Sequence, residues 1–139
     1  MRIEQTILKN LIQNESFARK VIPFLKSEYF TDSSEQLIYQ LTKEYFDKYT
    51  KNPTTEALLI NLDKITNVND KVIESSKQLI DDLSNQKEES AYEWVVNETE
   101  QWCKDRAIYI AVMNSIDVID KKSQRSTGEI PDLLKDALS

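Results

Sequence analysis

The sequence predicts an all-α protein in which a small globular helical bundle is followed by a protruding helical hairpin. Apolar residues recur at helical spacing along most of the 139 residues, and no pair of segments has the pattern of a strand hairpin. The chain has a single glycine, Gly128, and three prolines, so few positions interrupt the helices. We expect residues 1–86 to form the bundle and residues 87–139 to form the hairpin.

Two short helices are predicted first, with a packed connector after them. Apolar residues between Ile3 and Ile12 predict an amphipathic helix that ends near Asn14. A second helix follows, and Pro23 disturbs its end because the residue before a proline avoids helical geometry. Residues 24–30 hold three aromatic side chains in a stretch too irregular for a long helix, so we expect a packed connector there.

Three further helices complete the predicted bundle. The third has Ser33 as its cap and Gln36 as the capping-box partner, and it continues to Tyr49. Thr54 caps the fourth helix, and the fifth covers the apolar positions from 72 to 83. Aromatic side chains of the third helix recur beside Leu and Ile at helical spacing, which favours a core over a nucleic-acid stacking platform.

The hairpin is predicted to consist of a long helix at about 89–122 and a short helix at about 131–138. At 1.5 Å per residue the long helix would extend about 50 Å, more than the width of a compact domain of this size, so we expect part of it to protrude. Pro131 and Asp132 suit the first turn of the short helix. Because the short helix is too small to cover the apolar stripe of the long one, we expect the hairpin to be an oligomer interface. The candidate interface residues are Tyr92, Val95, Val96, Trp102, Ile110, Met113, Ile116, Leu133, Leu134 and Leu138.

The composition excludes several kinds of catalytic site. There is no histidine, the commonest general base and metal ligand, and the single cysteine, Cys103, cannot form an internal disulfide or a zinc site. One glycine cannot supply the phosphate-binding loops of nucleotide-binding proteins. Carboxylate chemistry stays open with 24 acidic residues, but no pair is singled out, because the acids lie among lysines on helix faces. We expect a buried Cys103 and no catalytic residue, cofactor or metal in this chain.

Acidic residues are concentrated near the junction of the bundle and the hairpin. The formal net charge is −6, and residues 81–100 hold seven acidic residues and one basic residue. This balance predicts weak or no direct DNA binding, because phosphates are neutralised by clustered Lys and Arg. Two interpretations of the acids Glu88, Glu89 and Glu93 stay open. They form a solvated loop and helix start, which the helix dipole favours, or they dock a basic partner.

Nothing in the sequence predicts a membrane segment. No run approaches the ~18 apolar residues of a membrane span, and the first residues lack the apolar stretch of a signal peptide. We therefore expect a soluble, cytoplasmic protein.

The order of several motifs resembles the N-terminal domain of DnaB-type replicative helicases. The landmarks are Lys-Ser-Glu-Tyr-Phe at 26–30, Glu-Gln-Leu-Ile-Tyr at 35–39 and Pro-Thr-Thr-Glu-Ala-Leu at 53–58. Three later stretches are similar to the helicase of T-even-like phages, namely Glu-Thr-Glu at 98–100, Arg106-Ala107 and the ending from Ile130 to Ser139. Cellular members often place a histidine before the core helix where this chain has Gln36, a departure that favours the phage branch.

The resemblance implies an assembly and docking module without catalytic residues of its own. In the family a linker and a RecA-like ATPase domain follow, and we expect neither in this chain, so that ATP and Mg²⁺ belong to that absent domain. Hairpins pair between subunits, the N-terminal domains form a collar on a hexameric ring, and primase and loading factors contact the collar. The implied partners are other copies of the chain in a dimer or ring, primase and a helicase loader, in the phage replisome of the host cell. The alternative is a helical adaptor of replication, such as a helicase loader or the helicase-binding domain of a primase.

Overall fold

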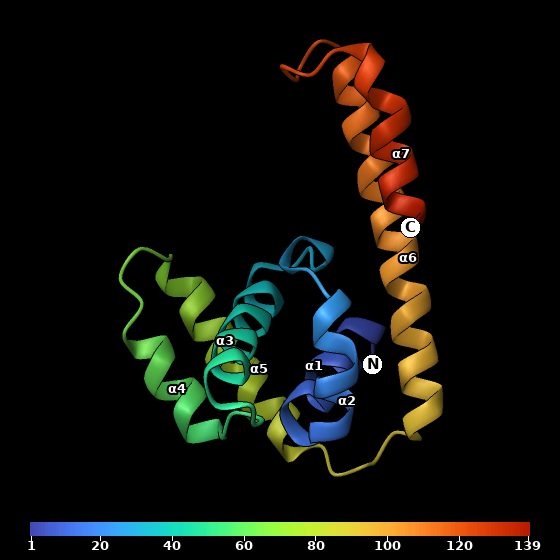
Figure 1. The fold of residues 1–139 in the computed structure, drawn as a ribbon. Coiled ribbons are helices and arrows are strands. Elements are labelled where there is room, and N and C mark those ends of the chain that lie inside the picture. Colours follow the sequence, from blue (N-terminus) through green and yellow to red (C-terminus); the bar gives the residue numbers. More distant parts are fainter. The chain divides into compact units, whose positions relative to one another are not determined.

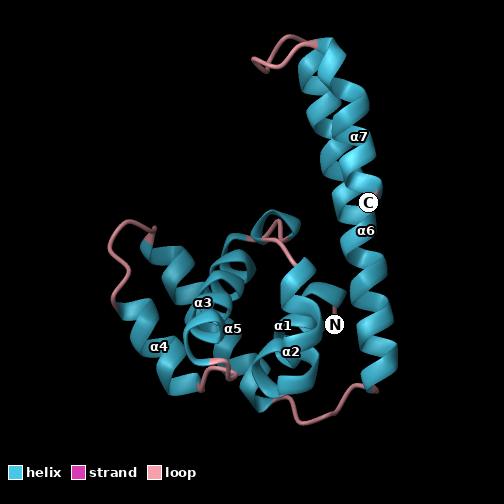
Figure 2. Cartoon of the chain, viewed as in Figure 1, coloured by secondary structure: helices cyan, strands magenta, loops and turns pink.

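The protein is built from helices and loops alone, which confirms the predicted all-α class (Figures 1 and 2). The computed structural model describes all 139 residues. The α-helices are α1 (Ile3–Gln13), α2 (Glu15–Val21), α3 (Ser33–Tyr49), α4 (Thr55–Asp63), α5 (Asp70–Asn85), α6 (Tyr92–Ile119) and α7 (Ile130–Leu138). Short 3-10 helices occupy Ile22–Phe24, Ser27–Tyr29 and Thr127–Glu129.

The chain divides into two compact units, which we call the N-terminal unit (Met1–Thr99) and the C-terminal unit (Glu100–Ser139). The division falls inside α6, whereas the sequence suggested a boundary at residue 86. The first two turns of α6 belong to the N-terminal unit, where Val95 and Thr99 have no exposed surface. The burial of these two side chains shows that the first two turns of α6 pack into the N-terminal unit.

The N-terminal unit is a bundle centred on α3. This helix packs against α1, α4 and α5, while α4 also packs against α5 and α1 against α2. The predicted connector at residues 24–30 is confirmed, since Leu25 and Phe30 are buried in it. Phe30 stacks on Tyr39 with ring centroids 5.2 Å apart, and the Tyr39 hydroxyl donates to the Leu25 carbonyl at 3.1 Å. One buried tyrosine of α3 thus fixes an irregular segment to the core.

Polar side chains cap α2, α3, α4 and α5 of the N-terminal unit. Thr54 accepts a hydrogen bond from the backbone N–H of Ala57, which confirms it as the cap of α4. The predicted cap of α3 is wrong: Asp32, not Ser33, accepts from the next two free N–H groups. A carboxylate is the stronger acceptor at the positive end of a helix. Gln36 forms no capping box and donates instead to two carbonyls of the connector.

Two helices end at residues with left-handed backbone, and neither residue is glycine. Thr50 follows α3 with φ 55°, and Lys121 follows α6 with φ 60°. Lys121 and Lys122 donate their N–H groups to the carbonyls of Val118 and Asp117, the double hydrogen bond of a Schellman motif. The one glycine, Gly128, lies in a 3-10 turn with negative φ. Both helix ends therefore carry strain that a glycine would avoid.

The C-terminal unit is a helical hairpin made of the rest of α6 and the shorter α7, which runs back along it (Figure 1). Before α7, Ser126 and Glu129 form a capping box in which the Ser126 N–H donates to the Glu129 carboxylate at 2.7 Å. Pro131 and Asp132 lie in the first turn of α7, as predicted. In neither unit does a helix combine the length and the apolar character that crossing a membrane requires.

Candidate protein-interaction surfaces

The second half of α6 exposes a continuous apolar face. Between Ala107 and Ile116 the chain has no charged residue, although much of this stretch is open to solvent. Tyr109, Val112, Met113 and Ile116 follow each other at the spacing of one helix face and are 40–56% exposed. We call the full set the α6 apolar face; it comprises Ile108, Tyr109, Val112, Met113, Ile116 and Ile119.

The remaining side of this helix segment is buried. Ala111, Ser115 and Val118 recur one turn apart and have at most 7% of their surface exposed. The Ser115 hydroxyl donates to the Ala111 carbonyl at 2.8 Å, so its polar group is satisfied within the helix. Figure 1 shows α7 running beside this part of α6 within the hairpin. The α6 apolar face is therefore surface that α7 does not cover.

The short helix α7 also leaves apolar surface open. Leu133 is half-buried, whereas Leu134 and Leu138 are exposed. At the start of the α6 apolar face the Arg106 guanidinium lies over the Tyr109 ring, 5.1 Å from its centroid. Each helix of the hairpin thus exposes apolar side chains, and a cation lies at one end of the α6 apolar face.

The interface residues expected from the sequence fall into three groups. Val95 and Val96 are corrections: they are buried in the N-terminal unit, with 0% and 7% of their surface exposed, and offer no surface to a partner. Trp102, Ile110 and Leu133 are half-buried. The exposed group consists of Tyr92, Met113, Ile116, Leu134 and Leu138.

Four members of the α6 apolar face were not among the residues that the sequence selected. They are Ile108, Tyr109, Val112 and Ile119. The uncharged run from Ala107 to Ile116 is the signal for the first three of them. An apolar stripe traced from the start of the predicted long helix selects neighbouring positions instead.

The acids Glu88, Glu89 and Glu93 lie where α5 leads into α6. Glu88 and Glu89 are exposed in the connecting segment, and Glu93 is exposed in the first turn of α6. None of the three forms an ion pair within the chain. Their charge is available to a partner, and it also suits the positive end of the helix.

The backbone of this connecting segment is fastened to α1. The Lys9 ammonium donates to the Glu88 carbonyl at 3.0 Å, and the Asn10 amide donates to the Ser90 hydroxyl at 3.2 Å. The Gln13 amide donates to the Leu83 carbonyl at 2.9 Å and to the Gln86 carbonyl at 3.2 Å. Three polar side chains on one side of α1 therefore hold the segment that carries the acids.

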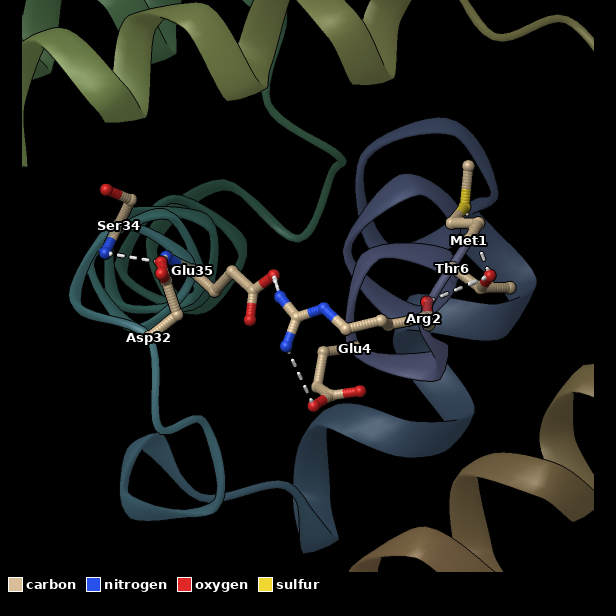
Figure 3. A network of polar contacts seen from close by, with 7 residues as sticks. All are labelled: Met1, Arg2, Glu4, Thr6, Asp32, Ser34 and Glu35. Carbon is tan, nitrogen blue, oxygen red and sulfur yellow. Dashed lines mark hydrogen bonds and ion pairs between the residues drawn. The ribbon is translucent and has the colours of Figure 1, made fainter.

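A buried carboxylate lies at the start of α3 (Figure 3). Glu35, 1% exposed, pairs with the Arg2 guanidinium, which also contacts Glu4 at 3.4 Å. Glu35 Oε1 has no hydrogen-bond partner. Burial raises the pKa of Glu35, and the nearby Arg2 offsets part of that rise. The pair joins the residue before α1 to α3, which is a structural role.

The structure has no cluster of metal ligands, and its one cysteine is buried. The chain has no group of three or more His, Cys, Asp or Glu residues arranged to hold a metal ion. The predicted burial of Cys103 is confirmed, and burial, with a smaller contribution from Glu100, raises the pKa of its thiol to about 12. At neutral pH the thiol is therefore protonated and a poor nucleophile.

The family follows from comparison with known sequences. The family model described as the DnaB-like helicase N terminal domain matches residues 1–98. This chain belongs to that family. The resemblance that the motifs indicated is confirmed, and the matched residues coincide with the N-terminal unit to within one residue.

The relationship to one curated helicase continues through the hairpin. The chain is similar to the DnaB-like replicative helicase of Enterobacteria phage T4, with 28% identity over 144 aligned positions. The alignment includes 97% of this chain but 30% of the T4 protein, so the chain spans about a third of that relative's length. The α6 apolar face thus lies beyond the family match and within the part aligned with the T4 helicase.

Proposed function

We propose that this DnaB-like domain is the collar of a hexameric replicative helicase, in which it assembles the ring and docks primase and loading factors. The observation that carries the proposal is the α6 apolar face, an uncharged and exposed surface on a helix of an otherwise acidic protein. Contiguous exposed apolar surface commonly marks an interface. The occupant that we propose for it is a second copy of the same hairpin.

Catalysis is assigned to another part of the parent protein. ATP and Mg²⁺ would bind a RecA-like ATPase domain, and this domain would contribute no catalytic residue. We also propose that direct binding to single-stranded DNA is weak, with a Kd of ~10⁻⁴ M or above and strong sensitivity to salt, because few cations are clustered. The setting would be the phage replisome in the host cytoplasm. The family match supports this role over that of a helical adaptor.

Sedimentation velocity over a range of concentrations tests the assembly role. The parent chain is expected to form dimers or larger oligomers, whereas Val112→Glu and Ile116→Glu are expected to remain monomeric, because a charge would be buried without a partner. Ile60→Glu is the matched control, since Ile60 is 48% exposed on α4 of the N-terminal unit. A parent chain that remains monomeric at about 1 mM, where even weak complexes form, would contradict the proposal.

The acids of the connecting segment are proposed to steer a basic partner such as primase. Exposed charges raise the association rate more than the affinity, and salt screens them. Reversal of Glu88, Glu89 and Glu93 to Lys is expected to slow primase association at low salt and to make the association rate less dependent on salt. The control reverses Glu44, Glu56 and Glu74, exposed acids on α3, α4 and α5, with the same change in net charge. Equal rates for the two triple variants would show that the acids of the connecting segment have no special role.

A further inference from the structure

A hollow of about 560 Å³ lies between α1 and the start of α6 in the N-terminal unit. Its lining includes Lys9 and Thr6 from α1, Ser90 from the connecting segment and Trp94 from the first turn of α6. Trp94 is 52% exposed, so about half of the surface of this large residue is open to a ligand. The role proposed above uses Glu88 and Glu89 from its lining, but it makes no use of Lys9, Thr6 or Trp94.

The ammonium of Lys9 is buried at the hollow with an incomplete set of partners. Lys9 is 6% exposed, and its one hydrogen bond goes to the Glu88 carbonyl. No carboxylate lies within 4.0 Å of it, although an ammonium has three N–H donors. A buried cation without a counter-charge is unfavourable. An acceptor that enters the hollow would remove this deficit.

The start of α6, which contributes Trp94 to the lining, has further free donors. Its first backbone N–H groups, at Tyr92, Glu93 and Trp94, receive no side-chain cap, whereas α2, α3, α4 and α5 are each capped by an Asn, Asp or Thr side chain. The nearest hydroxyl, on Ser90, accepts from Asn10 instead. Free N–H groups and the helix dipole favour an anion at such an end.

We propose that the hollow binds a small organic anion, with its carboxylate or phosphate group against Lys9 and the start of α6 and its flat body along Trp94. Lys9 and Lys87 in the lining are balanced by Glu88 and Glu89. The balance favours an anion of low charge over a polyanion such as DNA. The exposed indole side chain of Trp94 favours a ligand whose uncharged part is aromatic over one whose uncharged part is aliphatic.

Four probes separate the carboxylate from the phosphate and the charge from the ring: acetate, benzoate, inorganic phosphate and phenyl phosphate. The chain has two tryptophans, so Trp102→Phe leaves Trp94 as the fluorescent reporter. A saturable change in Trp94 fluorescence is expected for the aromatic member of at least one pair, together with shifts of the backbone amide NMR signals of residues 90–94. The non-aromatic member of that pair is expected to bind more weakly, by about tenfold. If all four probes act like chloride at equal ionic strength, the proposal is wrong.

The Lys9→Met variant tests the role of the buried ammonium. Loss of a charge-assisted hydrogen bond is expected to weaken binding by about tenfold or more. Lys51→Met, which removes an exposed lysine away from the hollow, is the control and should bind like the parent. Circular dichroism establishes whether Lys9→Met is folded, and unchanged affinity in a folded variant would overturn the proposal. If the variant does not fold, Trp94→Leu decides, with the backbone amide NMR signals as the readout. Equal binding of the aromatic and non-aromatic probes is then expected. A retained preference for the aromatic probes would contradict the site.

Discussion

The two units of this domain differ in the solvent exposure of their apolar side chains. In the N-terminal unit, large side chains such as Phe17, Ile38 and Leu58 have no exposed surface, and the few exposed ones are scattered. The C-terminal unit has 40 residues, and eight of its large apolar side chains are exposed: Ile108, Tyr109, Val112, Met113, Ile116, Ile119, Leu134 and Leu138. Two helices alone cannot enclose a core of their own. The N-terminal unit thus has its own core, and the C-terminal unit leaves much of its apolar side-chain surface exposed.

The comparison with known families follows the same division. The family match covers residues 1–98, the part that forms a complete core. The hairpin lies outside it, although the alignment with the T4 helicase includes it. Variants in the two units should therefore differ in kind: those in the first change stability, and those in the second change association.

The largest expected effect is the loss of a core side chain in the N-terminal unit. Leu58→Ala should lower the free energy of unfolding by about 2–5 kcal/mol, because Leu58 is fully buried and its removal leaves a cavity. Ile60→Ala, on the same helix, should change it by less than about 0.5 kcal/mol, since Ile60 is 48% exposed. Equilibrium denaturation measures both. Similar losses in the two variants would mean that the burial pattern of α4 is wrong.

A pH effect is expected from the buried carboxylate of the same unit. The pKa of Glu35 is raised in the folded protein above its ordinary value of 4.5, so the folded state binds this proton more tightly than the unfolded state. The contribution to stability is complete below 4.5 and is lost as the pH rises through the folded-state pKa. Relative to Glu35→Gln, the parent chain should become less stable over that range.

The Arg2→Met variant sharpens this pH prediction. Because Arg2 lowers the pKa of Glu35, its removal should extend the loss of stability to higher pH. Urea denaturation of the parent, Arg2→Met and Glu35→Gln at a series of pH values supplies the measurement. A constant difference between the parent and Glu35→Gln across the series would show that the carboxylate has an ordinary pKa.

The smallest expected effects are at the two strained helix ends, one in each unit. Thr50→Gly and Lys121→Gly should each stabilise the local structure by about 0.5–1 kcal/mol, because glycine adopts positive φ without a steric penalty. Thr50→Gly should raise the denaturation midpoint, and Lys121→Gly should slow amide exchange at the end of α6. Thr50→Ala and Lys121→Ala keep a Cβ atom and should show no gain. If the alanine variants gain as much as the glycine variants, φ is not the cause.

Much of the fold could be predicted from the sequence because its signals are local. Apolar periodicity located every α-helix, and the Thr54 cap was recognised because its partner is three residues away. The sequence alone does not decide which residue caps α3, since Asp32 and Ser33 are adjacent and both are common capping residues. Strong local signals therefore predict which helices form, and ambiguous signals leave the exact ends of those helices undecided.

The candidate site could be predicted less well, because it depends on contacts between distant residues. Val95 and Val96 share an apolar stripe with later residues of α6, and periodicity does not tell which part of a long helix has a covering partner. The bonds from Lys9, Asn10 and Gln13 to the connecting segment join residues 70–80 positions apart. No pattern in the sequence predicts such pairs.

The most direct test of the central claim, that the α6 apolar face is covered by a second copy, is the solvent exposure of individual methyl groups. An inert paramagnetic agent broadens the NMR signals of exposed methyls, and the measurement compares Val112 and Ile116 with Ile60 at low and high protein concentration. At about 1 mM, where weak complexes form, we expect Val112 and Ile116 to be protected and Ile60 to stay exposed. Equal broadening of all three methyl groups at both concentrations would contradict the account.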